Sequence, residues 1–309
     1  MELKAFKKEM KLMGNRFEIT VVASVAEWAY ERIEEAVNEI SRIEDLLSTY
    51  KEDSETNLIN RNAGIQPVKV SDEVYNLIER SIRISSITQG SFDISYGSID
   101  KRLWNFDKTM TSLPVSSIAK KMVRLINYKN IILDQANKTV YLKEKGMRIG
   151  FGGIGKGYAA EMAKAIMVKN GVTGGIVNAS GDLAAWGHQP DGKPWTIGIV
   201  HPDLAGQPFS YMNVTNGAVA TSGNYEKFVI IGGKKYSHTI DPKTGLPVTG
   251  IKSVTIISPN AEICDALATP VTILGIKNGI ELINQLKNVE CIIIDDNNKL
   301  YKSKNIHLS

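Results

Sequence analysis

Short strand-like segments dominate the chain after residue 170, and their distribution constrains the fold more than any other feature. They cover residues 175–178, 195–200, 211–214, 218–221, 227–231 and 253–257, and glycine turns break the chain between them. Strands that follow one another without intervening helices are typical of an α+β protein, whereas a doubly wound parallel sheet alternates strands with helices. The predicted fold class is therefore α+β.

Helical patterns account for much of the remaining chain. Apolar residues recur at helical spacing over 27–47, with charged residues between them, and predict an amphipathic helix. A second helix is predicted over 72–88, with Ser71 as its N-cap. The clearest helix covers 157–170 and is followed by Gly171, a C-cap candidate. Further predicted elements are a strand over 16–23, a short helix over 116–125, a hairpin of 131–133 with 139–142, helices over 262–273 and 279–286, and a strand over 291–294.

The length of 309 residues allows one large domain or two smaller ones. No internal repeat, linker or low-complexity segment divides the chain, so we predict a single domain over 1–309, or two closely packed lobes of about 1–128 and 129–309. The 43% of hydrophobic residues is that of an ordinary globular protein. Its 37 basic and 33 acidic residues leave a formal net charge of +4, and the basic residues are scattered, so no nucleic acid is expected as a partner.

Cysteines, histidines and apolar runs exclude several classes of protein. Two cysteines, Cys264 and Cys291, cannot form the disulfide framework of a small secreted domain. None of the four histidines has metal-ligand spacing, so any metal is expected to be a hard cation with oxygen ligands rather than zinc. No apolar stretch reaches 18 residues, which predicts no transmembrane segment. Since the first residues lack the apolar core of a signal peptide, the chain as written is predicted to be cytoplasmic.

A histidine beside a rigid turn is the first candidate for chemistry. His238 and Asp241 lie three residues apart, and Pro242 and Gly245 restrict the backbone that follows. Histidine is the side chain best suited to moving a proton near neutral pH. A histidine that only completes the hydrogen bonds of a strand end would show the same pattern, so this segment alone leaves both interpretations open.

A glycine cluster with a lysine precedes the clearest helix. Residues 152–157 read Gly-Gly-Ile-Gly-Lys-Gly, with the lysine at position 156. Small residues allow backbone amides to approach a phosphate, and the N-terminus of a helix attracts the anion. The spacing is not that of a Walker sequence and does not fit the dinucleotide fingerprint well, and close packing of backbones would also require glycines. Phosphate binding and close packing both stay open.

A carboxylate and a hydroxyl four residues apart are the candidate metal ligands. Asp265 and Thr269 have the spacing that brings two side chains to one face of a helix. Oxygen ligands of this kind suit magnesium, which takes few protein ligands and keeps positions for phosphate oxygens. A helix-start carboxylate and a buried threonine are the structural alternative. Because Pro270 follows directly, we expect the helix to bend beside Thr269.

An ordered set of segments resembles the ApbE family, the FAD:protein FMN transferases. The segments are 13–14, 46–57, 90–94, 152–158, 178–182, 221–225, 236–247 and 264–269. The resemblance extends from Met13 to about Gly275, nearly the whole chain. Segments in this order are far more specific than any one of them.

The resemblance implies an α+β, T-fold-related fold of mixed sheets with packed helices, and a set of site residues. The expected catalytic residues are His238 and Asp241; the expected FAD contacts are Met13, Tyr50, Ser91, Phe92, Asp93, Lys156, Asp182 and Thr239; the expected Mg²⁺ ligands are the Gly153 carbonyl, Asp265 and Thr269. From the residues alone, core packing of Phe92 and an Asx-turn at Asp182 remain alternatives. The chain departs from the family at Gly150, where relatives carry an aspartate, so one expected FAD contact is missing.

The implied reaction transfers FMN from FAD to a threonine or serine hydroxyl of an acceptor flavoprotein and releases AMP. The implied acceptor is a subunit of a respiratory complex or of a flavin reductase. Attack by water instead would make the protein an FAD pyrophosphatase, and without chemistry it would be an FAD-binding protein. Since many relatives are exported or lipid-anchored, a leader absent from this sequence would change the predicted compartment.

Overall fold

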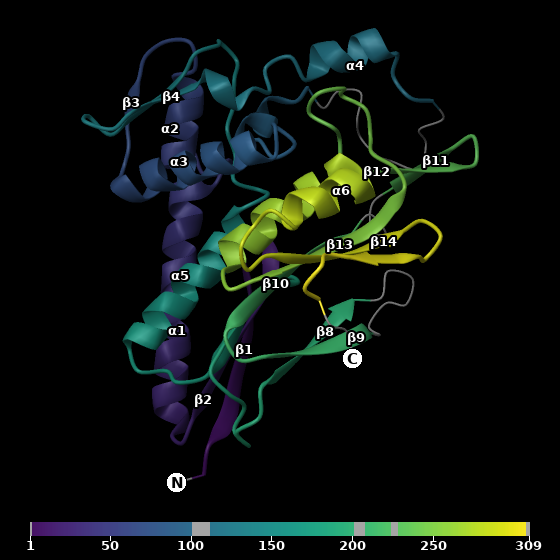
Figure 1. Cartoon of the computed structure of the whole chain (residues 1–309). Helices are drawn as coiled ribbons and strands as arrows, with labels where there is room; N and C mark the ends of the chain where they lie inside the picture. Colours follow the sequence, from purple (N-terminus) through teal and green to yellow (C-terminus); the bar gives the residue numbers. More distant parts are fainter. Residues whose placement is uncertain (1, 101–111, 201–207, 224–227, 307–309) are drawn as a thin grey trace.

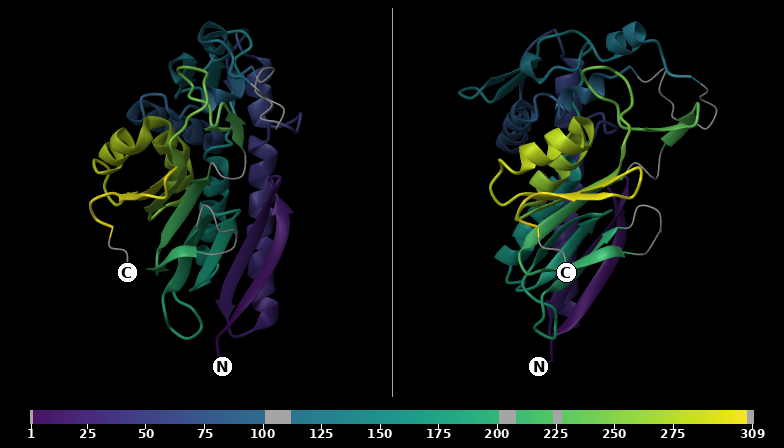
Figure 2. Two further views of the ribbon diagram at one scale, coloured as in Figure 1. Left: turned by 90° about the vertical axis from the view of Figure 1, so that its right-hand side faces the viewer. Right: turned by 45° about the vertical axis from the view of Figure 1, so that its right-hand side comes forward.

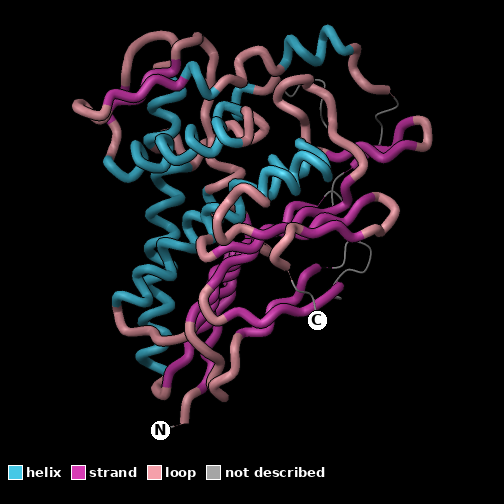
Figure 3. The backbone as a smooth tube through the Cα atoms, in the orientation of Figure 1, coloured by secondary structure: helices cyan, strands magenta, loops and turns pink. Residues whose placement is uncertain are grey.

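The central element of the fold is an eight-stranded sheet. The computed structural model describes residues 2–100, 112–200, 208–223 and 228–306. The strand order is β1-β2-β6-β7-β10-β13-β14-β15, and each neighbouring pair is antiparallel, which refines the mixed sheets expected from the sequence. The strands are β1 (Lys4–Leu12), β2 (Asn15–Ala23), β6 (Gly175–Ala179), β7 (Asp182–Trp186), β10 (Gly217–Gly223), β13 (Ile251–Ser258), β14 (Glu290–Asp295) and β15 (Leu300–Lys302). In Figure 3 the strands of this sheet lie in the lower part of the molecule, apart from the short strands at the upper left.

Three helices cover one face of this sheet: α1 (Ala26–Leu47), α5 (Gly155–Lys169) and α6 (Ala261–Ile283). Alternate residues of β2, namely Phe17, Ile19 and Val21, are fully buried in the core that these helices share. Figure 2 shows β1 and β2 running beside α1. The periodic apolar stripe of α1 is buried against this face as predicted, and the α+β class is confirmed.

A short ribbon packs on the opposite face of the sheet. It consists of β8 (Trp195–Val200) and β9 (Pro208–Val214). Leu183 and Ala185, which alternate with the residues facing the helices, lie in a second buried cluster with Trp195. The central strands are therefore covered on both faces, which is why β7 is buried along its whole length.

The remaining elements form the end of the molecule away from the N-terminus (Figure 1). They are α2 (Glu55–Arg61), α3 (Asp72–Ile87), η1 (Ile94–Ser98), α4 (Ser116–Met122), η3 (Tyr128–Asn130), the sheet of β3 (Val68–Lys69), β5 (Thr139–Leu142) and β4 (Ile131–Asp134), and the hairpin of β11 (Phe228–Ile231) and β12 (Lys234–Ser237). One buried apolar cluster joins this end to the central sheet. The division into one domain or two lobes stays a prediction.

Most locally encoded elements occur where the sequence predicts them. The Ser71 hydroxyl accepts a hydrogen bond from the Val74 amide at 3.3 Å, as expected for the N-cap of α3. The helix continues through Pro270, and the residue of α6 with non-helical backbone angles is Gly275, with φ 79° and ψ 173°. It separates the two helices that the sequence predicts there. Residues 224 and 225 of the segment 221–225, and residue 227 of the predicted strand 227–231, lie outside the described residues.

By length and composition alone, α6 is apolar enough to cross a membrane, contrary to the prediction that no such stretch exists. About 44% of its most apolar window is buried inside the protein. The helix packs against α5, β10 and β13, and it carries the buried carboxylates of Glu262 and Asp265. These contacts are those of a core helix.

Candidate active site

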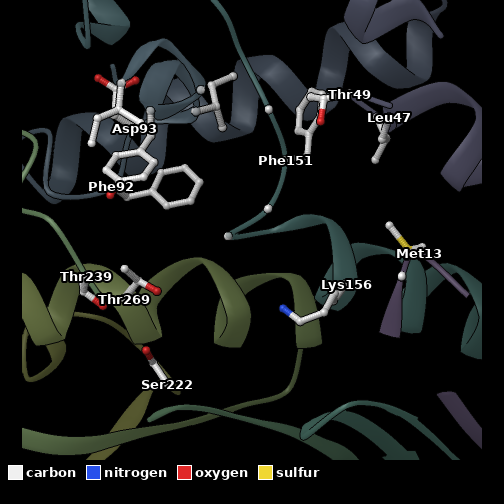
Figure 4. Close-up of a pocket in the computed structure, with 18 of the residues that line it drawn as sticks. Met13, Leu47, Thr49, Phe92, Asp93, Phe151, Lys156, Ser222, Thr239 and Thr269 are labelled. Atoms are coloured by element: carbon white, nitrogen blue, oxygen red, sulfur yellow. The ribbon is translucent and has the colours of Figure 1, made fainter. Parts of the chain in front are cut away.

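A cavity of about 940 Å³ lies between the end of α1, the start of α5, the middle of α6 and the turn after β12. Its lining includes ten of the thirteen predicted site residues: Met13, Tyr50, Ser91, Phe92, Asp93, Gly153, Lys156, His238, Thr239 and Thr269. Figure 4 shows Lys156 pointing into it from one side, with Phe92 and Thr239 on the other. The other three predicted residues, Asp182, Asp241 and Asp265, do not line the cavity, and each contacts a neighbouring residue of the site or its own turn, as described below.

The turn between β1 and β2 brings Met13 to the cavity. Leu12 pairs with Asn15, so the turn consists of Met13 and Gly14, both with positive φ, at 50° and 70°. Positive φ at both central residues is characteristic of the tight hairpin turn that matches the twist of two strands. The Met13 amide donates to Glu44 Oε2 at 2.8 Å, and Asn15 Nδ2 donates to the Met13 carbonyl at 2.7 Å. The turn is therefore anchored to α1, and this fixes the backbone of Met13 at the cavity.

The glycines before and within α5 serve two separate purposes. A Cβ on Gly157 would lie 2.2 Å from the carbonyl oxygen of Ala261, so this glycine is required where α5 and α6 cross. A Cβ on Gly152 would have no atom within 4 Å, and a Cβ on Gly153 would meet only the Phe92 ring, at 3.7 Å. Both of these glycines line the cavity at the N-terminal end of α5. The close-packing interpretation thus holds for Gly157, while the glycines before the helix leave open space for an anion.

Lys156 lies between two buried carboxylates. Its Nζ is 2.7 Å from Asp182 Oδ2 and 3.3 Å from Asp265 Oδ1. Burial and the charge of Asp265 raise the pKa of Asp182 to about 7, and Lys156 and the Thr221 backbone offset this only in part. Burial opposes the charge of Lys156, but Asp265 and Asp182 outweigh it and raise the pKa of the lysine. The lysine is therefore a permanent cation at the cavity wall.

The candidate metal ligands come from α6 and the start of α5. Asp265 Oδ2 accepts a hydrogen bond from the Gly157 amide at 2.9 Å, which fixes the carboxylate, and Thr269 faces the cavity beside Thr239 (Figure 4). Within the described ranges, no cluster of three or more His, Cys, Asp or Glu side chains could hold a metal. One carboxylate, one hydroxyl and the Gly153 carbonyl are hard oxygen donors. This set fits a cation such as Mg²⁺ that takes further ligands from phosphate and water.

His238 lies at the cavity and follows β12 directly. Its side chain is exposed, whereas Ile240 is buried with Met122 and Val123. The Asp241 carboxylate accepts hydrogen bonds from the Lys243 amide at 2.8 Å and the Thr244 hydroxyl at 3.1 Å. These contacts orient the turn, which is one of the two functions considered for Asp241.

The segment 91–93 is buried beside the cavity and held by its own hydrogen bonds. The Asp93 carboxylate accepts from the Ser95 amide at 2.8 Å and the Tyr128 amide at 2.7 Å. Burial raises the pKa of Asp93 despite these bonds. Its carboxylate turns away from the cavity interior (Figure 4), so it caps η1 and fixes the segment. Tyr50, in contrast, is 95% exposed at the rim of the cavity.

Several cavity residues have no clear signal in the sequence. Ser222 lies within the segment 221–225, but nothing in its pattern predicts a function, and Figure 4 shows it near Thr269. Burial raises the pKa of Tyr96 to about 12, and the Ile240 backbone offsets this only in part. A Cβ on Gly150 would lie 3.4 Å from the Thr49 methyl group. Only the folded chain brings these separate segments together.

Comparison with known proteins gives consistent matches. A model of the ApbE family matches residues 13–293. The FAD:protein FMN transferase of Klebsiella pneumoniae (strain 342) is 30% identical over 266 residues, which cover 85% of this chain and 82% of that protein. The crystal structure of the ApbE protein from Thermotoga maritima superimposes with a TM-score of 0.86 at 28% identity, covering 97% of each chain. The flavin transferase ApbE from Vibrio cholerae, at 23% identity and a TM-score of 0.85, supports the fold over 98% of each chain.

Proposed function

The chain belongs to the ApbE family, and from that premise we propose that it is an FAD:protein FMN transferase. The observation that carries the proposal is the cavity itself. It brings His238, the glycine-rich start of α5 and Thr269 of α6 to one space, with Lys156 aimed into it. A volume of about 940 Å³ is in the range of cofactor pockets.

The transfer is a phosphoryl transfer with a simple balance of bonds. The hydroxyl oxygen of a threonine or serine attacks the phosphorus on the FMN side of the FAD pyrophosphate. A new P–O bond forms, the bond to the bridging oxygen breaks, and AMP leaves with that oxygen. The proton of the hydroxyl passes to a base. In such reactions the protein contributes mainly positioning and neutralisation of charge.

FAD binding uses both polar and apolar parts of the cavity wall. The open glycines Gly152 and Gly153 and the N-terminus of α5 receive the pyrophosphate, and Lys156 supplies a positive charge beside it. Phe92 and Met13 offer apolar surface to the ring systems. The missing aspartate at Gly150 leaves one family contact unfilled, and the Thr49 side chain adjoins that position.

Mg²⁺ would be held by the Gly153 carbonyl, Asp265 and Thr269, and when bound it neutralises charge on the pyrophosphate. His238 accepts the proton of the acceptor hydroxyl, because it is exposed at the cavity where a protein substrate can approach. Asp241 holds the turn that carries it. The acceptor is a flavoprotein subunit of a respiratory complex or flavin reductase.

The rival functions are an FAD pyrophosphatase that uses the same site and a protein that only binds FAD. The exposed His238 at the cavity favours a reacting acceptor over storage, because a buried binding site needs no base at its rim.

The test is incubation of the protein with FAD, Mg²⁺ and a candidate acceptor protein, followed by intact mass spectrometry and nucleotide chromatography. The proposal predicts an acceptor heavier by one phosphoester-linked FMN and an equal amount of AMP. An acceptor whose target threonine is replaced by alanine is the matched control. Free FMN with AMP and no adduct would instead identify a pyrophosphatase, and no AMP at all would identify a binding protein.

A further inference from the structure

When both of its carboxyl groups are ionised, the cluster around Lys156 carries an excess of negative charge. One ammonium group lies between two carboxylates, those of Asp182 and Asp265, and both side chains are only 8% exposed. The nominal sum of these three charges is one negative charge. An unbalanced buried charge is costly, and proteins usually pair it with a counter-ion or neutralise it.

The Asp182 carboxylate is the group of this cluster whose charge is least well compensated. Its Oδ2 is buried, and among the described residues none gives it a well-aligned hydrogen bond, although Lys156 Nζ lies 2.7 Å away. Burial and the charge of Asp265 raise the pKa of this carboxyl. The geometry and the charge both indicate a cluster that lacks one cation.

Both carboxylate oxygens of Asp265 already have a partner. Oδ2 is engaged by the Gly157 amide at 2.9 Å, and Oδ1 faces the Lys156 ammonium at 3.3 Å. A divalent cation that binds Asp265 through Oδ1 would lie close to the ammonium group, and the two positive charges repel each other. The lysine and the metal therefore compete for Oδ1.

We propose that the Lys156 ammonium group pairs with Asp265 while the divalent cation is absent and gives way when the cation binds Asp265. Asp182 then holds the ammonium group beside the site. This rests on the proposed function only for the location of the cation on Asp265. The lysine is already closer to Asp182 than to Asp265, so the exchange needs only a short movement of Nζ. Asp182 is thus a positioning residue: it keeps the ammonium group beside the pyrophosphate after the metal arrives.

The test measures binding of Mn²⁺, as a probe for Mg²⁺, to the FAD-free protein at about pH 8 by electron paramagnetic resonance. The decisive variant is the double substitution Lys156→Met and Asp182→Asn. It removes one positive and one negative charge, so the net charge of the cluster is unchanged while the competing ammonium is gone. We expect it to bind Mn²⁺ about tenfold more tightly than the unsubstituted protein, the scale of a charge-assisted hydrogen bond.

Three single substitutions complete the test: Asp182→Asn, Lys156→Met and Lys164→Met. Asp182→Asn leaves Asp265 as the sole partner of the lysine, so Mn²⁺ affinity should fall. The factor of this fall should be larger than the factor that Asp182→Asn causes in a protein that already carries Lys156→Met. Lys164→Met is the matched control, since Lys164 lies on the same helix, pairs with Glu161 at 3.1 Å and should leave Mn²⁺ affinity unchanged. Thermal unfolding checks that each variant is folded.

Equal Mn²⁺ affinity of the double variant and the unsubstituted protein would overturn the proposal, because net charge alone would then set affinity. Equal factors for Asp182→Asn with and without Lys156→Met would overturn it as well. The measurement uses neither FAD nor an acceptor, so it can fail while the transferase assignment stands. Absence of any Mn²⁺ binding in the protein and all variants would also reject this inference, because no cation would then exchange with the lysine in the FAD-free protein.

Discussion

Gly245 packs so closely on Ala119 that a Cβ at position 245 would lie 2.2 Å from the Ala119 carbonyl oxygen. Gly245 also has a φ of 70°, which other residues adopt at a cost. The contact joins the turn that carries His238 to α4, and Ile240 of the same turn is buried against Met122. The position of the histidine therefore depends on a helix more than 100 residues earlier in the chain.

Gly245→Ala is expected to shift this turn and lower kcat by about 10–100-fold, because displacement of a reacting group by about 1 Å has effects of that size. Gly250→Ala is the matched control: Gly250 has a φ of 92° but no atom within 4 Å of the added methyl group. Its kcat should stay close to that of the unsubstituted protein. Equal losses in the two variants would show that backbone strain, not the contact with Ala119, is responsible.

His238→Asn should lower the rate of FMN transfer by about 10²–10⁴-fold, because it removes the proton acceptor. FAD affinity should stay within a few-fold, since asparagine retains much of the size and hydrogen bonding of the histidine. Single-turnover kinetics and calorimetry measure the two quantities separately. Joint loss of binding and transfer would make His238 a part of the cofactor pocket, and an unchanged rate would make it a structural residue of the turn.

Asp265→Asn should abolish Mg²⁺-dependent transfer while the protein remains folded. The asparagine oxygen still accepts from the Gly157 amide, and Lys156 keeps Asp182 as its partner. Asp265→Ala should abolish transfer too, but it also leaves the Gly157 amide without an acceptor, so it should unfold at lower denaturant concentration. Mg²⁺ titration of the rate, with urea unfolding alongside, checks both; a normal Mg²⁺ dependence in Asp265→Asn would remove this carboxylate from the site.

Asp182 should make the stability of the metal-free protein depend on pH. Its pKa is about 7 in the folded protein against an ordinary value of 3.8, so the folded state binds the proton more tightly than the unfolded state. The contribution to the free energy of unfolding is therefore present below about pH 4 and is lost as pH rises towards 7. Urea unfolding in the presence of a chelator should show a flatter pH profile for Asp182→Asn. Superimposable profiles for the two proteins would contradict the raised pKa.

Gly157→Ala tests the crossing of α5 and α6. The added methyl group would lie 2.2 Å from the Ala261 carbonyl oxygen, so the helices must separate, and the free energy of unfolding should fall by about 3 kcal/mol. Gly152→Ala adds a methyl group with no atom within 4 Å and should change stability by less than about 0.5 kcal/mol. Urea unfolding measures both, and equal stabilities would show that the crossing can relax.

The sequence predicted the elements whose pattern is local. The stripe of α1, the cap of α3 and the hairpin of β4 and β5 each depend on residues within a few positions of one another. The separate segments with chemical patterns were predicted in the same way, and their order along the chain indicated the family. None of these inferences needed to know which segments meet.

The sequence did not predict β1 or β7, for opposite reasons. β1 is a lysine-rich edge strand, and Lys8 interrupts the alternation of its apolar residues Phe6, Met10 and Leu12, so its pattern is weak. β7 reads Asp-Leu-Ala-Ala-Trp, which suits a turn and a helix as well as a strand, and it becomes a strand because it lies between β6 and β10.

Sequence alone therefore determined the α+β class, most of the helices and the residue types of the site. The tertiary structure decided that Lys156 meets Asp182 and Asp265, although 26 and 109 positions separate the lysine from them, and that the Asp241 carboxylate accepts hydrogen bonds within its own turn. The physical reason is the distance along the chain over which each interaction acts. Periodicity, caps and turns act over a few residues, whereas burial, charge and close packing depend on which distant segments the folded core brings within a few ångströms of one another.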